Sequence, residues 1–295
     1  MRAIHNRRSS FVALGFLLIG VVVGACSVFI LVGRSGTSTS QAGAANATAA
    51  APGPLSVAVY GDSLITQAEP YLVADLANAN RRVTVAMDDF PGTALCDWLP
   101  QMRTSAGSTR PNTVVIEFSG NIFTPCISQI FKDGGSTAVA ANYQRDLRQA
   151  IAIFEGVGTQ HIIVAGAPTM ANSRYRSTDT LVRQGYISTV AKLNDPRVTY
   201  EPAGQWVDDP HTDGFALIRS CIIFEQIRGL CTGPAVAGMA TDIVRSSDGV
   251  HFCNDSASTT RQREPTWCPG AWRYANAITT SIMNHNGFGP LPPTP

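Results

Sequence analysis

From Leu55 onward, short apolar runs alternate with longer segments of helical spacing, and this alternation constrains the fold more than any other feature. Strands are expected at 55–60, 82–87, 113–118, 161–165 and 198–200, and helices at 64–79, 139–154, 180–193 and 272–283. Such alternation is typical of a parallel sheet with helices on both faces. We therefore predict one α/β domain over 55–295, a three-layer α/β/α sandwich with a mainly parallel central sheet.

An uncharged apolar run at 11–32 precedes this domain. As a helix, at about 1.5 Å per residue, it is roughly 33 Å long, enough to cross the hydrocarbon core of a bilayer. Three arginines precede the run and only Arg34 follows closely, so the positive-inside rule places residues 1–10 in the cytoplasm. We predict a single-pass transmembrane helix, an extracytoplasmic domain, and a flexible Ser/Thr/Ala/Gly-rich linker at 33–54.

Two alternatives exist for the N-terminal run. It resembles a cleaved signal peptide, although an apolar core of that kind is usually about 7–15 residues long. Val23-Gly24-Ala25-Cys26 also loosely resembles a lipoprotein signal, but the residues after Cys26 stay mostly apolar.

Arginine outnumbers lysine twenty to two, which favours a bacterial source with a GC-rich genome. The membrane is therefore expected to be a bacterial cytoplasmic membrane.

Six of the seven cysteines lie in the predicted extracytoplasmic domain. An even number of cysteines in an oxidising compartment is typical of disulfides. Loop lengths favour the pairs Cys96–Cys126, Cys221–Cys231 and Cys253–Cys268. No pair has the short Cys-x-x-Cys spacing of a zinc ribbon, so no structural zinc is expected.

Two short motifs, far apart in the chain, carry residues suited to nucleophilic acyl chemistry. Gly61-Asp62-Ser63-Leu64 directly follows the first expected strand, and Asp248-Gly249-Val250-His251 comes near the C-terminus. A turn exposes the serine, a histidine removes its proton, and an aspartate holds the imidazole in the required tautomer. Each motif alone is also typical of an ordinary turn, so the interpretation depends on their joint occurrence at strand ends.

These motifs resemble the conserved blocks of the SGNH or GDSL hydrolases. The first block matches Gly61-Asp62-Ser63-Leu64, the second loosely matches Phe90-Pro91-Gly92-Thr93-Ala94, the third matches Ser119-Gly120-Asn121, and the last matches Asp248-Gly249-Val250-His251. Their order and spacing agree with the family over about 55–285. The resemblance implies a flavodoxin-like SGNH fold.

The resemblance also implies a role for each matching residue. Ser63 is the nucleophile, His251 is the general base, and Asp248 orients the histidine. The backbone N–H groups of Ser63 and Gly92 and the side-chain amide of Asn121 form the oxyanion hole. Such donors stabilise the charge that develops on the carbonyl oxygen.

The third block departs from the family pattern at two positions. Ser119 stands where the family often has glycine, and Ile122 follows Asn121 where aspartate is frequent. A frequent supporting residue is therefore missing. The second block also departs, because it lacks the Asn-x-Gly setting common in the family. Both departures leave the chemistry intact but leave the substrate class open.

Several other polar and aromatic residues are weaker candidates. His211 is a rival base within the acidic run 208–213, but the carboxylate spacing fits no known ligand pattern, so we expect a solvated loop and no metal. The long stretch 202–247 fits no simple pattern and is interpreted as a lid or substrate loop. The tryptophans are expected to pack in the core or in loops, with sugar stacking as the alternative.

The sequence thus predicts a membrane-anchored serine esterase that needs no cofactor. Its expected substrate is an ester-linked acyl group on a cell-envelope glycan or lipid, inferred from location alone. The 22 basic and 21 acidic side chains nearly balance, which argues against nucleic-acid binding. One alternative is an envelope O-acyltransferase with the same triad, and the sequence leaves open whether a membrane partner supplies its acyl donor. The other is a catalytically silent binding domain.

Overall fold

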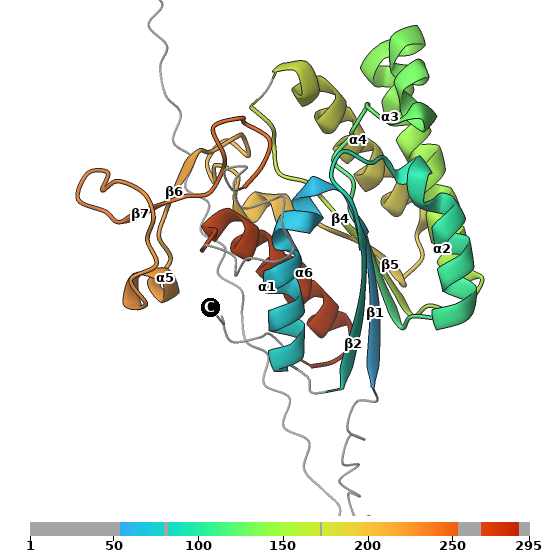
Figure 1. Ribbon diagram of the computed structural model, residues 1–295, viewed down its shortest axis with the longest axis horizontal. Coiled ribbons are helices and arrows are strands. Elements are labelled where there is room, and N and C mark those ends of the chain that lie inside the picture. Colours follow the sequence, from blue (N-terminus) through green and yellow to red (C-terminus); the bar gives the residue numbers. More distant parts are fainter. Residues whose placement is uncertain (1–53, 80–81, 172, 253–266, 289–295) are drawn as a thin grey trace, which may run out of the picture. The chain divides into compact units, whose positions relative to one another are not determined.

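The domain is built around a five-stranded sheet (Figure 1). The computed structural model describes residues 54–79, 82–171, 173–252 and 267–288. The strands are β1 (Leu55–Gly61), β2 (Val83–Asp89), β3 (Thr113–Ile116), β4 (His161–Ala165) and β5 (Val198–Glu201). Their order is β2-β1-β3-β4-β5 and every neighbouring pair is parallel, which is the flavodoxin-like order. The predicted parallel α/β fold is confirmed.

Side chains of β1 alternate between two hydrophobic cores, one on each face of the sheet. Val57 and Val59 pack into the first core, whereas Ala58 and Tyr60 pack into the second. The alternation follows from the two-residue period of a strand. The central strands β3 and β4 are mostly apolar and buried, because both of their faces are covered.

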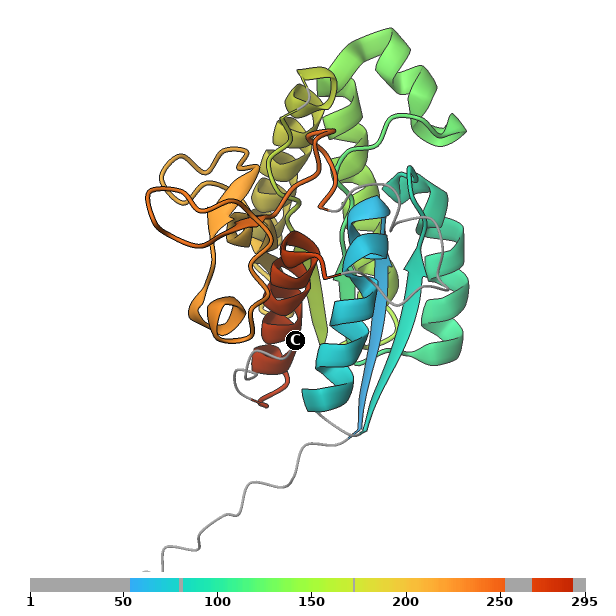
Figure 2. The same cartoon turned by 60° about the vertical axis from the view of Figure 1, so that its left-hand side comes forward.

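Helices cover both faces and complete three layers (Figure 2). The first face is covered by α1 (Ser63–Ala79) and α6 (Pro269–His285), whose buried side chains belong to the first core. The second face is covered by α2 (Leu95–Thr109), α3 (Pro125–Glu155) and α4 (Ser173–Leu193). The consecutive helices α2, α3 and α4 thus share one face, whereas α1 and α6, from opposite ends of the domain, share the other. Right-handed connections explain the change of face after α1, because the chain reverses its direction across the sheet after β2.

The second face contains most of the differences from the predicted elements. α2 was not predicted, because Pro100 and several Ser and Thr residues lower its helix propensity. The predicted 139–154 segment is only the later part of α3, which begins at Pro125 and is interrupted at Gly135, with φ 62°. Glycine adopts this positive φ without steric cost, so the chain bends there instead of ending.

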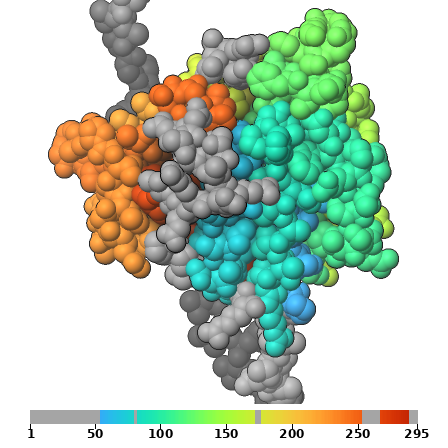
Figure 3. All heavy atoms as spheres, viewed as in Figure 1, coloured from blue at the N-terminus to red at the C-terminus, as the bar shows by residue number. Residues whose placement is uncertain are grey.

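The stretch predicted as a lid forms a small unit of its own. It contains the 3₁₀ helix η1 (Ala203–Trp206), α5 (Ile223–Ile227), and the antiparallel pair β6 (Ile218–Ser220) and β7 (Thr241–Ile243). The later part of this unit, drawn in orange, occupies one side of the visible surface (Figure 3).

A buried arginine on α6 holds this unit to the rest of the domain. The Arg273 guanidinium donates to the carboxylates of Glu225 and Asp242, at 2.6 and 2.9 Å, and all three side chains are almost completely buried. Because both buried carboxylates accept hydrogen bonds from one buried guanidinium, the unit is fixed to α6 by ionic hydrogen bonds as well as by packing.

Two of the three predicted disulfides are present, Cys96–Cys126 and Cys221–Cys231. The third prediction involves Cys253, which lies outside the described residues. The apolar run 11–32 and the linker 33–54 also lie outside them, apart from Pro54. Among the described residues, no helix is long and apolar enough to span a membrane.

Candidate active site

Ser63 is the first residue of α1, immediately beyond the carboxyl end of β1. The first N–H groups of a helix have no intrahelical acceptor, so the Ser63 N–H is available to a ligand. A tight junction places it there, because a Cβ on Gly61 would lie only 2.3 Å from a side-chain carbon of Ile65. Glycine is therefore needed at position 61 for close packing between β1 and α1.

Ser63, His251 and Asp248 come together as a triad. The Nε2 atom of His251 lies 2.9 Å from Ser63 Oγ, and its Nδ1 atom lies 2.6 Å from Asp248 Oδ2. In the tautomer that donates from Nδ1 to the aspartate, Nε2 accepts the serine hydroxyl hydrogen. The two motifs therefore meet in the geometry that proton abstraction from Ser63 requires.

Asp248 also shapes the turn that carries the histidine. Its Oδ1 atom accepts the backbone N–H groups of Val250 and His251, at 2.8 and 3.0 Å. Partial burial raises the pKa of the Asp248 carboxyl, but hydrogen bonds from the His251 ring and from these two N–H groups outweigh burial and leave the pKa below its usual value. The carboxylate that orients His251 is thus kept ionised.

Asp62 connects the loops that follow β1 and β3. Its fully buried carboxylate accepts hydrogen bonds from Leu64 N–H at 3.0 Å, from Ser119 N–H and Oγ at 2.8 and 2.6 Å, and from Asn121 Nδ2 at 3.0 Å. Burial raises the pKa of Asp62, while the hydrogen bonds from Ser119 and Leu64 oppose that rise. No role was predicted for Asp62, although it lies within the first motif.

The two departures in the third block now have a structural explanation. Ser119 supplies two of the bonds that hold Asp62, and a glycine there would lack the hydroxyl bond. Ile122 is buried in the second core. Support for the loop after β3 therefore comes from the Asp62–Ser119 pair.

Gly92 and Asn121 both border the same pocket as Ser63. Gly92 has φ +80°, which favours glycine although a Cβ there would meet nothing within 4 Å. The Asn121 amide donates to Asp62 Oδ2 at 3.0 Å and to the carbonyl of Thr93 at 3.2 Å. Both of its hydrogens are thus engaged, and a substrate oxygen has to compete with the longer of these bonds.

Arg245 is a residue that the sequence analysis missed. Its buried guanidinium donates to the carbonyls of Thr169, at 3.1 Å, and of Val250 and His251, and it lies over the rings of Phe215 and Phe252. Arg245 therefore anchors the turn that carries His251. No motif signals this role, because it depends on which carbonyls lie nearby in space.

The pocket at the carboxyl ends of β1 and β3 has a volume of about 390 Å³. Its floor and walls combine the triad with mainly apolar groups; the lining residues include Pro91, Phe123, Met170 and Val250. Phe123 is about half exposed, at 54%, whereas Met170 is only 4% exposed. The pocket lies between the strands where the sheet order reverses, where open α/β sheets generally bind ligands.

The weaker candidates lie elsewhere. His211 is exposed and its backbone N–H bonds to Asp209, and neither residue lines the pocket. The expectation of a solvated acidic loop is wrong for Asp208, which is buried, accepts hydrogen bonds from Thr169 and pairs with Arg183 at 3.6 Å. None of residues 202–247 lines the pocket, so this structure does not support the lid interpretation.

Two of the tryptophans pack together. Trp272 is buried in the first core, 5.4 Å from the ring of Trp267, which also contacts Tyr71. Trp206 is exposed but does not line the pocket. Packing therefore explains Trp267 and Trp272, as was expected for tryptophan in the absence of other signals.

Comparison with solved structures agrees with the predicted fold. A catalytic mutant of an acetylxylan esterase from Geobacillus stearothermophilus superposes with a TM-score of 0.50 at 12% identity, over 80% of this chain and 96% of that chain. A candidate GDSL-like lipase from Parabacteroides merdae gives 0.46 at 12%, over 80% and 97%. A lipase/acylhydrolase from Enterococcus faecalis gives 0.39 at 16%, over 60% and 92%.

At these identities the similarity concerns the fold. The domain shares its α/β fold with that acetylxylan esterase, and a parallel α/β fold is what the sequence predicted. No protein-family model matches the chain, and no curated protein sequence matches it.

Proposed function

We propose that this protein is an SGNH-type serine esterase that cleaves ester-linked acyl groups through an acyl-serine intermediate. The observation that carries the proposal is the triad, in which His251 Nε2 is 2.9 Å from Ser63 Oγ and Nδ1 is 2.6 Å from Asp248. A shared fold supports it without specifying the activity.

The reaction follows from this geometry. Ser63 Oγ attacks the ester carbonyl while His251 Nε2 takes its proton, and Asp248 stabilises the imidazolium that forms. The histidine then gives the proton to the departing alcohol, which leaves an acyl ester on Ser63. Water, activated by the same histidine, hydrolyses that ester and restores the serine hydroxyl.

The oxyanion of each tetrahedral intermediate is assigned to the N–H groups of Ser63 and Gly92 and to the Asn121 amide. In the free protein, the Asn121 amide donates one hydrogen bond to the Thr93 carbonyl, at 3.2 Å. A developing negative charge is a stronger acceptor than a neutral carbonyl, so it competes well for this hydrogen as the reaction proceeds.

The substrate proposal combines the pocket with the predicted location. Apolar side chains such as Phe123, Met170 and Val250 suit the hydrocarbon part of an acyl group. The N-terminal apolar run supports anchoring in the cytoplasmic membrane with the domain outside. We therefore assign the alcohol half to an envelope glycan or lipid.

The test uses the full-length protein with its disulfides formed. Hydrolysis of a series of p-nitrophenyl acyl esters is compared in wild type, Ser63→Ala and His251→Ala. Loss of about 10⁴-fold or more in kcat is expected in both variants, because members of a triad act as a unit. Activity that survives in Ser63→Ala would contradict the mechanism, and acyl transfer to an added sugar in place of free acid would indicate a transferase.

A further inference from the structure

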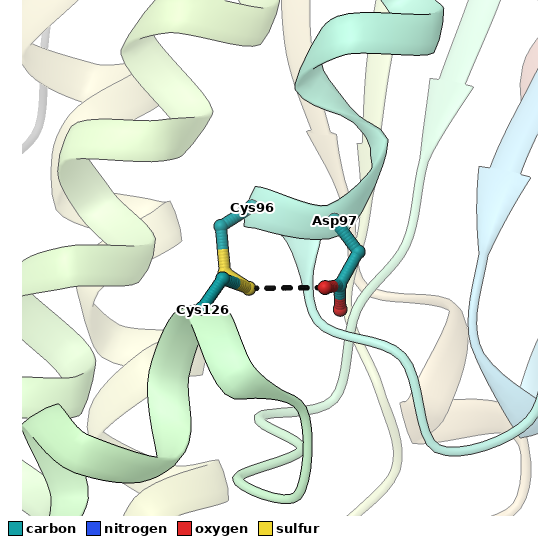
Figure 4. Close-up of side chains that lie close together, drawn as sticks. All are labelled: Cys96, Asp97 and Cys126. Carbon is teal, nitrogen blue, oxygen red and sulfur yellow. Dashed lines mark hydrogen bonds between the residues drawn. A yellow bond between two sulfur atoms is a disulfide. The ribbon is translucent and has the colours of Figure 1, made fainter.

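The Cys96–Cys126 disulfide joins the two loops that carry Gly92 and Asn121. Cys96 is the second residue of α2, shortly after the loop with Gly92, and Cys126 is the second residue of α3, shortly after the loop with Asn121. The two Cα atoms are 6.2 Å apart (Figure 4). A covalent bond thus closes the far ends of both loops, whose near ends are fixed by β2 and β3.

One hydrogen bond beside the disulfide joins the same two loops, and others order the segment that follows Gly92. Thr93 accepts a hydrogen bond from the Asn121 amide through its carbonyl, and another from the Trp98 ring nitrogen, at 3.0 Å, through its hydroxyl. Asp97 caps the start of α2 by accepting the N–H of Ala94 at 2.8 Å. Its other carboxylate oxygen lies 3.2 Å from Cys126 Sγ, the contact dashed in Figure 4.

We propose that the Cys96–Cys126 disulfide is a positioning element of the oxyanion hole, which sets the separation of the Gly92 and Asn121 donors. This inference rests on the proposed esterase function. Donors stabilise an oxyanion only when they lie about 2.7–3.1 Å from its position, and a shift of about 1 Å at a catalytic group can cost on the order of 10²-fold in rate. The bond limits such shifts where Gly92 and Asn121 come from different loops.

The second disulfide offers a matched control. Cys221–Cys231 spans 10 residues within the unit that contains β6 and β7, and no residue of that unit lines the pocket. Its removal also deletes a cross-link but leaves both oxyanion loops as they are.

The experiment compares full-length Cys96→Ser/Cys126→Ser with Cys221→Ser/Cys231→Ser at a temperature where circular dichroism shows both folded. We expect the first pair to lower kcat about tenfold or more with little change in KM, because the oxyanion hole acts mainly in the transition state. Inhibition by an alkylboronic acid, which forms a tetrahedral anion on Ser63, should weaken by a similar factor. The pH profile of kcat/KM should stay the same, because the triad is untouched.

The control pair should keep kcat and boronic acid inhibition within about twofold of wild type. A second test uses Asn121→Ala as background, where removal of Cys96–Cys126 should cost much less than in wild type, because one donor that it positions is gone. Unchanged kcat and inhibition in the first pair, equal losses in both pairs, or full additivity with Asn121→Ala would overturn the inference.

Two further readouts keep these outcomes separate. If the serine pair does not fold, Cys96→Ala/Cys126→Val fills the space, and a phosphine can reduce the bond in folded wild type while mass spectrometry reports which bonds have opened. A wild-type protein that fails to hydrolyse any ester would instead refute the proposed function, before any variants are compared.

Discussion

At the scale of single residues, the site depends on a buried carboxylate outside the triad. Asp62 accepts four hydrogen bonds, and three of them come from residues in the loop after β3. Because two of these bonds come from Ser119 and one from Asn121, Asp62 determines where that loop lies relative to Ser63. The Gly-Asp-Ser motif thus positions a loop as well as carrying Ser63, the proposed nucleophile.

We expect Ser119→Ala to destabilise the protein and to lower kcat. The change removes the 2.6 Å hydroxyl bond to Asp62 but keeps the backbone bond at 2.8 Å. A hydrogen bond to a charged group contributes about 1.5–3 kcal/mol, so urea unfolding should show a loss of about that size. Ser188→Ala is the control, since it loses only a 3.1 Å bond to a helical carbonyl on α4. Equal losses in the two variants would contradict a special role for Ser119.

At the scale of elements, the junction of β1 and α1 is set by close packing. Gly61→Ala would place a Cβ 2.3 and 2.4 Å from two side-chain carbons of Ile65, at a buried position. We expect a loss of about 1–3 kcal/mol in unfolding free energy, typical of overpacking, with reduced kcat because Ser63 follows closely.

A second glycine provides the control for that variant. A Cβ at Gly107, which lies on the exposed side of α2, would meet nothing within 4 Å. Gly107→Ala should therefore stabilise the protein by up to about 1 kcal/mol through helix propensity, without effect on kcat. The unfolding free energy and kcat are measured for both variants. If Gly61→Ala is as stable as wild type, the junction of β1 and α1 adapts easily to the added Cβ.

The helix α2 illustrates how an element can be missed. Its buried residues Leu95, Leu99, Met102 and Ala106 follow helical spacing, so a weak signal was present. Pro100 and the surrounding Ser, Thr and Gly residues obscured it, because they are poor helix formers in isolation. Packing against the sheet and α3 outweighs that local preference.

At the scale of the whole molecule, two buried carboxyl groups outside the triad have raised pKa values. Burial raises the pKa of Asp179 to about 7, with Asp208 adding to the rise and Arg183 and Arg245 opposing it. Burial also holds the pKa of Glu117, at the end of β3, well above its usual value. The folded state therefore binds protons that an unfolded chain would release.

This difference predicts how stability depends on pH. An aspartate in the unfolded chain titrates near pH 3.9, whereas the pKa of Asp179 in the folded protein is about 7. Its contribution to the free energy of unfolding is therefore fully present below about pH 4 and is lost as the pH rises to about 7. Asp179→Asn should remove this contribution. Its unfolding free energy relative to wild type should rise between pH 4 and 7 and then level off, as measured by urea unfolding across this range.

The control for that measurement is Asp133→Asn, at an exposed position on α3. It should follow the wild-type curve at every pH. The prediction is wrong if the difference in unfolding free energy between Asp179→Asn and wild type stays constant from about pH 4 to about pH 7. Asp179 would then ionise as easily in the folded state as in the unfolded one.

The sequence by itself determined the sheet and the identity of the triad residues. Strands such as 55–60 and 161–165 could be recognised because buried parallel strands are continuous apolar runs. Ser63 and His251 could be recognised because their motifs have a set order along the chain. The pairs Cys96–Cys126 and Cys221–Cys231 also followed from loop lengths.

Only the tertiary structure decided how the site is supported. Arg245 binds carbonyls, which every residue possesses, so no residue pattern could indicate which ones it would meet. Asp208 proved to be buried because Arg183, distant in sequence, lies beside it. Ser119 replaced a missing support because the loops after β1 and β3 lie side by side. A motif consists of residues that are close together in the chain, so it can be recognised in the sequence. Burial and hydrogen-bond partners depend on contacts between distant segments, which exist only once the sheet and its helices have packed.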